Sequence, residues 1–483
     1  MSDKETVVSI EELCAMKMTQ SNDNNSYVVS TSEVRKVISF SEEESSDIAD
    51  IDELVEAEKG KKEAPVPDKP KIQKVPIILR DNKDFNKLYE PRAIPIGPIH
   101  YKNERLKLAR RYKPRLAARF IKESGKSTRE LYEKIKAEME ALKLLFDPEV
   151  IEDYKEDELS WMLFLDGCST LQFIYGFAGD RLKEYNIKSD QVAFAQQDLF
   201  LLENQIPFKV LTLLIDSSTA KKELIKSIKS FLQTNVMAPS HMWESIEIDI
   251  YKEDPTHLLE LLQKFAIHQS STKDDKFSDK KLSLLSCLMR EKQNTSEQSF
   301  PTIKELIAAG IDLKPSKTHS LKDINFNSSC LKLPPLSVDD STGPKLLNWV
   351  MCPDNFRTNY EVSSYVIFLD LLIDNSNDVK ELKSAKILFN HLGSDDVVAR
   401  LFNEIATDLV SCPSLYRDVL ENIQKYYTST LTVLVKTWMA EAYATYFKSP
   451  WTILAFLGAL IALALTIVQT WYAINPPPDN HRN

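Results

Sequence analysis

Three side chains in this sequence are of the types that nucleophilic or acid–base catalysis uses: Cys168, Glu203 and His257. A cysteine nucleophile needs a histidine base within hydrogen-bond reach, and a glutamate can transfer protons. The structural alternative is stronger, because Cys168 lies in an apolar run where a thiol packs as a small hydrophobic group. Glu203 follows the expected end of a helix, where it would bind exposed backbone groups. We therefore predict no catalytic residue, and keep a membrane-tethered enzyme of unknown reaction, using one of these three residues, as the alternative.

The other cysteines and histidines form no pattern that would bind a metal. The chain has six cysteines without a CxxC pair, and its histidines lack ligand spacing. Gly125-Lys126-Ser127 matches the end of a phosphate-binding loop, but the earlier glycine of such a loop is replaced by Phe120. Ser127 with Glu130 predicts a helix capping box instead. We expect no metal and no cofactor, and the sequence identifies no small-molecule substrate.

Charge is distributed unevenly along the chain. The net charge of −10 argues against general nucleic-acid binding, because neutralisation of phosphates supplies the affinity of such proteins. Residues 102–122 are nevertheless strongly basic, and Arg110, Arg111 and Arg115 are candidate contacts for anionic lipid headgroups. A solvated helix face, or pairing with the chain's own acidic tail, are the alternatives for this basic segment.

Glycine content indicates the fold class. Ten glycines in 483 residues is about 2%, against a usual content near 7%. Doubly wound sheets and phosphate-binding folds use glycine in tight turns, whereas helices need it mainly at their C-terminal ends. We predict a mainly α protein, with a multi-helix globular domain.

A C-terminal segment has the length and composition of a membrane span. Residues 451–474 contain no charge, and as a helix they would extend about 36 Å, more than a hydrocarbon core of about 30 Å. Trp451 at one end, and Trp471 with Tyr472 at the other, suit the aromatic belts of a bilayer. We predict a single-pass helix that binds the lipid bilayer of the plasma membrane or an endomembrane; the alternative is a buried core helix.

The charges that flank this segment favour a cytosolic location for the bulk of the chain. Lys436 and Lys448 precede the segment and Arg482 follows it, in agreement with the positive-inside rule. The first residues do not combine a basic region with an apolar run, so we expect no signal peptide. A glycan on any of the sequons at Asn24, Asn294 and Asn327 would contradict this orientation.

The remaining chain divides by composition. We predict a disordered acidic tail over 1–70, a helical domain over 71–447 and a short tail over 475–483. Within the domain, 269–299 reads as a polar insert, and 312–344 as irregular with room for short strands. The predicted helices are Glu104–Lys122, Ser127–Phe146, a central core helix over Leu159–Ile174, Gln196–Glu203, Pro207–Ile215, His257–Phe265, Pro301–Gly310, Val362–Ile373, Val379–His391, Val397–Val410 and a last one from Leu415 toward Phe447.

Several runs together resemble a plant family called domain of unknown function 247. They are Val75–Arg80, Ile96–His100, Met162–Cys168, Leu201–Phe208, His257–Leu259, Asn359–Tyr365, Leu392–Asp396 and Pro450–Trp451. The resemblance implies a plant origin, a largely helical domain with a C-terminal anchor, and no known catalytic residue. Its motif residues, which we expect to be structural, are Asp166, Gly167, Cys168, Glu203, Asn204, Gln205 and Pro207.

The same resemblance suggests a role in recognition. Some grass members of the family are associated with pollen self-incompatibility, so by analogy we expect an unknown protein partner. The chain departs from the family where Ser169 replaces the usual phenylalanine after Asp166-Gly167-Cys168.

Overall fold

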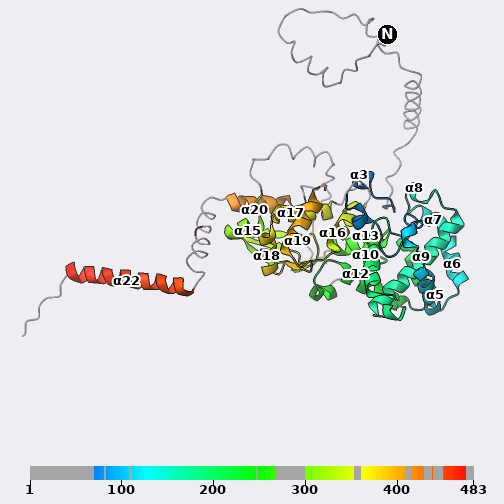
Figure 1. Cartoon of the computed structure of the whole chain (residues 1–483), viewed down its shortest axis with the longest axis horizontal. Helices are drawn as coiled ribbons and strands as arrows, with labels where there is room; N and C mark the ends of the chain where they lie inside the picture. The colour runs from blue at the N-terminus through cyan, green and yellow to red at the C-terminus, as the bar shows by residue number, and fades with distance from the viewer. Residues whose placement is uncertain are drawn as a thin grey trace, which may run out of the picture. The chain divides into compact units, whose positions relative to one another are not determined.

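The structure is a computed structural model of the whole chain (Figure 1). It describes residues 70–80, 83–107, 111–185, 187–245, 249–267, 300–352, 360–407, 409, 415–428, 438 and 450–474. The predictions for the acidic tail (Pro70 apart), the polar insert at 269–299 and the short tail at 475–483 lie outside the described residues, as does Arg110.

The part of the domain up to residue 267 is helical. Its helices are α3 (Ile77–Arg80), α4 (Phe85–Tyr89), α5 (Tyr112–Ser124), α6 (Thr128–Ala137), α7 (Met139–Lys143), α8 (Pro148–Ile151), α9 (Glu156–Ala178), α10 (Ser189–Asp198), α11 (Phe208–Ser217), α12 (Lys221–Asn235) and α13 (Leu258–Ile267), with 3-10 turns η2 (Glu104–Leu106), η4 (Leu182–Tyr185) and η5 (Ser240–Ser245). The mainly α fold predicted from the sequence is confirmed.

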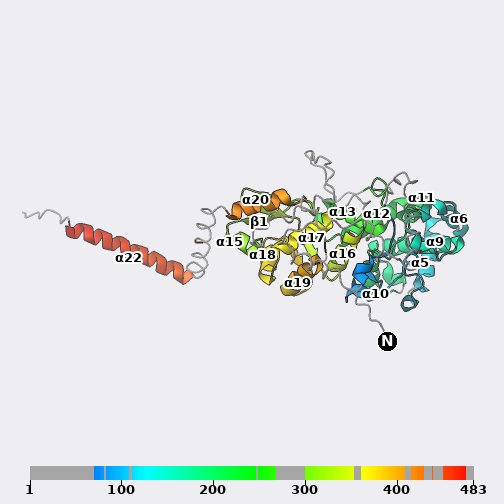
Figure 2. The same cartoon turned by 90° about the horizontal axis from the view of Figure 1, so that it is seen from above.

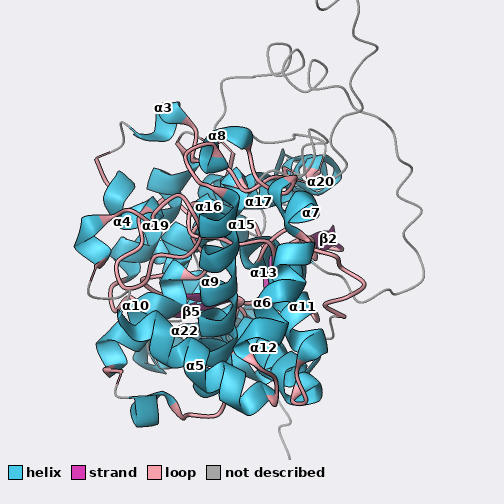
Figure 3. Cartoon of the chain, turned by 90° about the vertical axis from the view of Figure 1, so that its right-hand side faces the viewer, coloured by secondary structure: helices cyan, strands magenta, loops and turns pink. Residues whose placement is uncertain are grey.

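Helix α9 is the centre of this part and confirms the predicted core helix. Figure 3 shows it surrounded by α5, α6, α11 and α12, all of which it contacts. Glu156, Asp157 and Glu158 occupy its first turn, where carboxylates interact favourably with the helix dipole. Beyond that turn it is buried on almost every side, which is why its sequence is apolar without a polar stripe.

Residues 300–428 combine helices with short strands. The helices are α15 (Ile303–Ala308), α16 (Thr342–Met351), α17 (Glu361–Leu372), α18 (Ser376–Ser384), α19 (Asp395–Ala406) and α20 (Arg417–Thr428), and the strands are β1 (Asp312–Pro315), β2 (Asn325–Asn327), β3 (Cys330–Leu333), β4 (Leu336–Val338) and β5 (Leu388–Asn390). One sheet has the order β1-β3-β2, with β1 parallel and β2 antiparallel to β3, and β4 pairs with β5 in parallel. Figure 2 shows α17, α18, α19 and α20 gathered around β1.

Two predicted helices have different boundaries in the structure. The basic helix predicted from Glu104 is wrong in its first half, where η2 is a single 3-10 turn and α5 begins only at Tyr112. The helix predicted to run from Ser127 to Phe146 is divided at Glu138 into α6 and α7. Ser127 caps α6 by accepting a hydrogen bond from Glu130 N–H at 3.2 Å, while the Glu130 carboxylate pairs with Lys126.

The helix predicted over Val379–His391 is wrong after Ser384. Lys386 has a left-handed φ of 58°, and Ile387 N–H closes the helix by donating to Leu382 C=O. The apolar residues that follow form β5, in which Leu388 is paired with Leu336 of β4. An apolar period can be satisfied by a buried strand as well as by a helix, and here tertiary pairing decides.

Helix α22 (Pro450–Ile474) is long and apolar enough to cross a membrane, by length and composition. Every side chain in its window Leu454–Trp471 is exposed, as the predicted membrane span requires. Two of its hydroxyl groups are satisfied internally, since Thr466 and Thr470 each donate to the carbonyl four residues earlier at 2.8 Å. The side chains of Trp451 and Tyr472 lie outside the described part of the chain; Trp471 is exposed.

Candidate functional site

The motif residues converge on one extended segment, residues 92–100, which is rich in proline and has few backbone bonds of its own. Its first backbone donors bind a single carboxylate at the end of α10. Arg92, Ala93 and Ile94 donate their N–H groups to Asp198 at 3.0, 2.6 and 2.9 Å. Burial raises the pKa of Asp198, and these three backbone bonds oppose the rise.

Asn204 binds the next residues of the segment on both sides. Its Oδ1 accepts from Ile96 N–H at 2.6 Å, and its Nδ2 donates to Ile94 C=O at 3.0 Å. Nδ2 also donates to Asp198 C=O at 2.9 Å, so the same amide ties the segment to the end of α10. Asn204 is 1% exposed, and burial is tolerated because these bonds satisfy its amide.

Asp166 of α9 holds the middle of the segment. Its Oδ2 accepts from Gly97 N–H at 2.8 Å, and its Oδ1 pairs with Lys113 Nζ of α5 at 2.5 Å. Both charged side chains are buried. Complete burial raises the pKa of Asp166, and the Lys113 ammonium and the Gly97 amide oppose that rise.

Glu203 binds a second segment, which leads into α3. It accepts from Val75 N–H at 2.7 Å and from the Arg80 guanidinium, and His100 Nε2 lies 3.3 Å from its Oε2. Burial raises the pKa of Glu203, but the donors from His100, Val75 and Arg80 outweigh it and bring the pKa below its usual range. The carboxylate is therefore ionised at neutral pH.

Gln205 and Pro207 shape the turn itself. Gln205 Nε2 donates to the carbonyls of Leu199 and Leu201 at 2.9 and 2.8 Å, and its Oε1 accepts from Leu259 N–H at 3.3 Å. Pro207 precedes α11 as its N-cap, where a missing N–H costs nothing. These bonds explain why the helix predicted over Gln196–Glu203 is wrong: α10 ends at Asp198, because the amide side chain satisfies the carbonyls that a longer helix would use.

Gly167 and Cys168 serve the packing of α9. A β-carbon on Gly167 would lie 2.7 Å from Val210 Cγ1 and 2.8 Å from Leu214 Cδ1, so glycine allows α11 to approach closely. Cys168 is completely buried, and burial raises the pKa of its thiol far above the usual range. A nucleophilic cysteine is a partly exposed thiolate, and Cys168 has neither property.

His257 acts as a neutral cap for α13. Its Nδ1 accepts from Glu260 N–H at 3.1 Å, and its Nε2 lies 3.9 Å from Cys352 Sγ. Because Nδ1 accepts, the ring proton is on Nε2. Complete burial lowers the pKa of His257 to about 4, so the ring is uncharged at neutral pH.

The residues nominated for catalysis are not brought together. In the described part of the chain, no hydrogen bond or ion pair joins any two of Cys168, Glu203 and His257, and each has a different set of neighbours. No group of three or more His, Cys, Asp or Glu side chains in the same part is placed to hold a metal ion. What the geometry provides is a set of polar side chains that bind backbone groups of the segments at 75–80 and 92–100.

Sequence reasoning missed one of these residues and the partner of another. Asp198 was not singled out, although a carboxylate between Gln197 and the run Leu199-Phe200-Leu201-Leu202 is an unusual position for a charge. Lys113 belongs to the basic stretch 102–122, for which a solvated face was one alternative, but it is 2% exposed and is the counter-charge of Asp166. Its periodic position on the face of α5 that carries Leu116 and Phe120 was the available signal.

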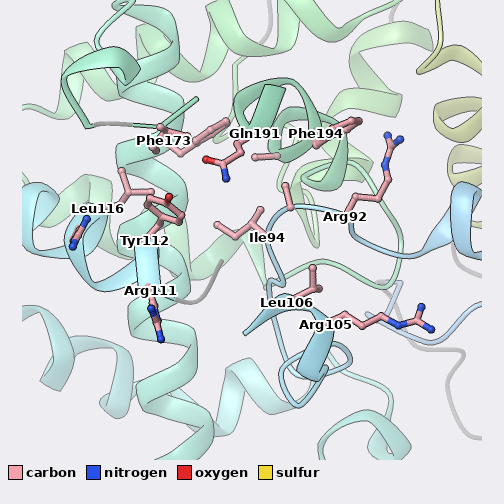
Figure 4. Close-up of a pocket in the computed structure, with 14 residues that line it drawn as sticks. Arg92, Ile94, Arg105, Leu106, Arg111, Tyr112, Leu116, Phe173, Gln191 and Phe194 are labelled. Carbon is pink, nitrogen blue, oxygen red and sulfur yellow. The ribbon is translucent and has the colours of Figure 1, made fainter. Parts of the chain in front are cut away.

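The basic residues nominated as lipid contacts have a distinct environment. Arg111 and Arg115 line a cavity of about 540 Å³ between α5, α10 and the segment at 92–94, together with Arg92 and Arg105 (Figure 4). Both residues are exposed.

The comparisons with known proteins agree with the resemblance seen in the motifs. The profile of a family described as "plant protein of unknown function", DUF247, matches residues 72–465. The chain belongs to this family. The match includes every motif residue discussed above and ends within α22.

Two proteins of Arabidopsis thaliana are similar to this chain. The chain is 28% identical to UPF0481 protein At3g47200 over 412 residues, which covers 80% of this chain and 83% of the relative. It is 27% identical to the putative UPF0481 protein At3g02645 over 177 residues, 36% of this chain and 33% of that relative. No solved structure matches this DUF247 chain.

Proposed function

We propose that this DUF247 protein is a membrane-anchored recognition protein without catalytic activity, whose helical domain binds another protein. The observation that supports the proposal is the use of the motif side chains. Four motif side chains bind backbone groups of the same chain and are not free to bind or activate a substrate: Asp166, Glu203, Asn204 and Gln205. Asp198, which lies outside the motif, binds backbone groups in the same way. The motif is thus accounted for by the stability of a scaffold.

The location we propose is a single bilayer crossed by α22, in the plasma membrane or an endomembrane. A helix of 25 residues with exposed apolar side chains is suited to lipid, and its internally bonded threonines remove the cost of placing hydroxyls there. The basic residues on the N-terminal side of α22 support a cytosolic location of the domain. By analogy with grass members of the family, pollen recognition is the physiological setting that we propose to test first.

A pull-down of the full chain from mildly solubilised plant membranes tests the recognition role. The control is α22 fused to an unrelated soluble domain, which enters the same membrane without the helical domain. We expect at least one protein to be enriched reproducibly by the full chain and not by the control. If no protein is enriched above the control in native tissue, the proposal of a protein partner is wrong.

Protease protection on intact microsomes, with a tag at each end, tests the orientation. We expect the N-terminal tag to be digested and the C-terminal tag to survive. Asn327 gives an independent reading, because it begins the sequon Asn327-Ser328-Ser329 and is exposed at the turn between β2 and β3. A glycosidase-sensitive mass shift that disappears in Asn327→Gln would place the domain on the lumenal or external side instead.

A further inference from the structure

The cavity beside α5 has the composition of a binding site for a small amphipathic anion. Its lining contains four arginines, Arg92, Arg105, Arg111 and Arg115, and none of the lining residues is acidic. Its volume of about 540 Å³ lies within the range of roughly 300–1,000 Å³ that small-molecule sites occupy. The floor is apolar and aromatic, with Ile94, Leu116, Phe173 and Phe194 among the lining side chains.

Two of the four arginines, Arg111 and Arg115, are available to a ligand, whereas the other two have partners within the chain. Arg92 packs over the Phe194 ring at 4.5 Å and donates to Gln197, and Arg105 lies 3.9 Å from Glu90. In contrast, among the described residues no carboxylate lies within 4.0 Å of the guanidinium of Arg111 or Arg115.

Arg111 and Arg115 are also spaced to hold one anionic group together. They are four residues apart at the start of α5, so their side chains leave the same face of the helix, about 6 Å apart at the β-carbon. The N-terminal end of α5, which they share, carries the positive end of the helix dipole. An anion at this position would receive charge-assisted hydrogen bonds from two guanidinium groups.

The lining of the cavity includes one polar atom without a hydrogen-bond partner and one exposed ring. Gln191 Oε1 is shielded from solvent and has no hydrogen-bond partner. Figure 4 shows the Gln191 amide and the Tyr112 hydroxyl projecting into the same space, with the labelled arginines toward its edge. Phe194 is 41% exposed although it is a large aromatic side chain. An apolar body in the cavity would cover this ring.

Asp198, whose hydrogen bonds are described above, fixes the position of the cavity. Asp198 holds Arg92, Ala93 and Ile94 at one wall and ends α10, which provides Gln191 and Phe194 at the other. The walls are therefore preorganised by buried hydrogen bonds, and a ligand would not have to order them.

We propose that this cavity binds a small organic acid with a flat apolar body, whose anionic group lies between Arg111 and Arg115. Two kinds of molecule combine an anionic group with an apolar body: a free carboxylic acid and an anionic membrane lipid. The proposal does not depend on the protein partner proposed above, because it is tested with purified protein.

Titration calorimetry of the full chain in nanodiscs of zwitterionic lipid, with 2-naphthoate as the probe, tests the site. Heat from empty nanodiscs is subtracted. We expect saturable binding that is at least tenfold weaker for neutral 2-naphthalenemethanol and for inorganic phosphate, because each lacks one half of the proposed ligand. Repeating the titration in nanodiscs that contain anionic lipid separates the sources: unchanged affinity indicates a free acid, and competition indicates a lipid.

The variant R111Q/R115Q is expected to weaken 2-naphthoate binding at least tenfold without changing the melting temperature, since both side chains are exposed and neither forms an ion pair with another described residue. R129Q/R400Q is the matched control, because it removes the same charge from exposed positions on α6 and α19. The proposal is overturned if 2-naphthoate does not saturate, if phosphate binds equally well, or if both double variants weaken binding to the same extent.

Discussion

Gly97 approaches the backbone of Gln205 so closely that a β-carbon on Gly97 would lie 2.1 Å from the Gln205 carbonyl oxygen. Gly97 also has a left-handed φ of 73°. The contact joins the proline-rich segment to the turn between α10 and α11, and it depends on the absence of a side chain. The family motif is therefore a pair of chain segments that fit one another.

This contact predicts a strong effect of Gly97→Ala. The new methyl group meets backbone atoms that cannot rotate away, so we expect a loss of about 4 kcal/mol or more in the free energy of unfolding, measured by urea titration in a mild detergent. Gly393→Ala is the control, because Gly393 has a φ of 88° with no atom within 4 Å of its β-carbon position. Its cost should be only about 1–2 kcal/mol. Equal losses in the two variants would show that backbone conformation, and not the contact, determines the effect.

The buried pair of Asp166 and Lys113 predicts non-additive substitutions. Asp166→Asn leaves the Lys113 ammonium buried without a counter-charge, and we expect a loss of about 3–5 kcal/mol. Adding Lys113→Met removes that charge, so the double variant should be more stable than Asp166→Asn alone in the same urea titrations. A double variant whose loss equals the sum of the two single losses would contradict a coupled pair.

His257 predicts a pH dependence of stability. Its pKa is about 4 in the folded chain and about 6.5 when unfolded. The unfolded chain therefore takes up a proton first as the pH falls, and the stabilisation present above pH 6.5 is lost toward pH 4. Between pH 7 and pH 5 this group should account for about 2 kcal/mol of lost stability.

His257→Asn isolates this contribution, because the asparagine Oδ1 can replace Nδ1 as the cap of α13 but does not titrate. We expect the variant to lose less stability than the parent chain between pH 7 and pH 5, by unfolding measured at both pH values. Identical pH profiles would mean that the ring does not titrate in this window.

Cys168 predicts resistance to thiol reagents. Its thiol is buried and protonated, whereas Cys330 is partly exposed. In a brief reaction with a mild alkylating reagent, analysed by mass spectrometry of peptides, we expect Cys330 to be labelled first and Cys168 only after denaturation. Rapid labelling of Cys168 in the folded chain would contradict this prediction and would support the alternative of an enzyme with Cys168 as its nucleophile.

Helices and caps could be predicted from the sequence where a residue's role is local or where a segment is completely buried. The apolar run that became α9 and the Ser127 cap of α6 follow from composition and spacing along the chain. Helix α12 is not among the predicted helices, although its buried residues Leu224, Ile228 and Phe231 recur at helical spacing.

The candidate site could be predicted only in part, because its bonds cross long sequence separations. That Glu203 and Asn204 bind backbone groups could be inferred from the sequence, but the groups they bind lie 128 and 108 residues away. The end of α10 is determined by hydrogen bonds from the Gln205 side chain, and helix propensities of the residues in α10 do not include this effect. The cavity beside α5 was beyond prediction, since it depends on where Phe173, Phe194 and Arg111 meet in space.

The attachment of residues 92–100 also sets a sequence of events during synthesis. Ile96 leaves the ribosome 108 residues before Asn204, its hydrogen-bond partner, a delay of roughly 5–20 s at about 5–20 residues per second. During this interval the donors of the proline-rich segment bond to water, and its apolar side chains have no core to join. The segment can therefore adopt its native conformation only after the second half of the motif has been translated.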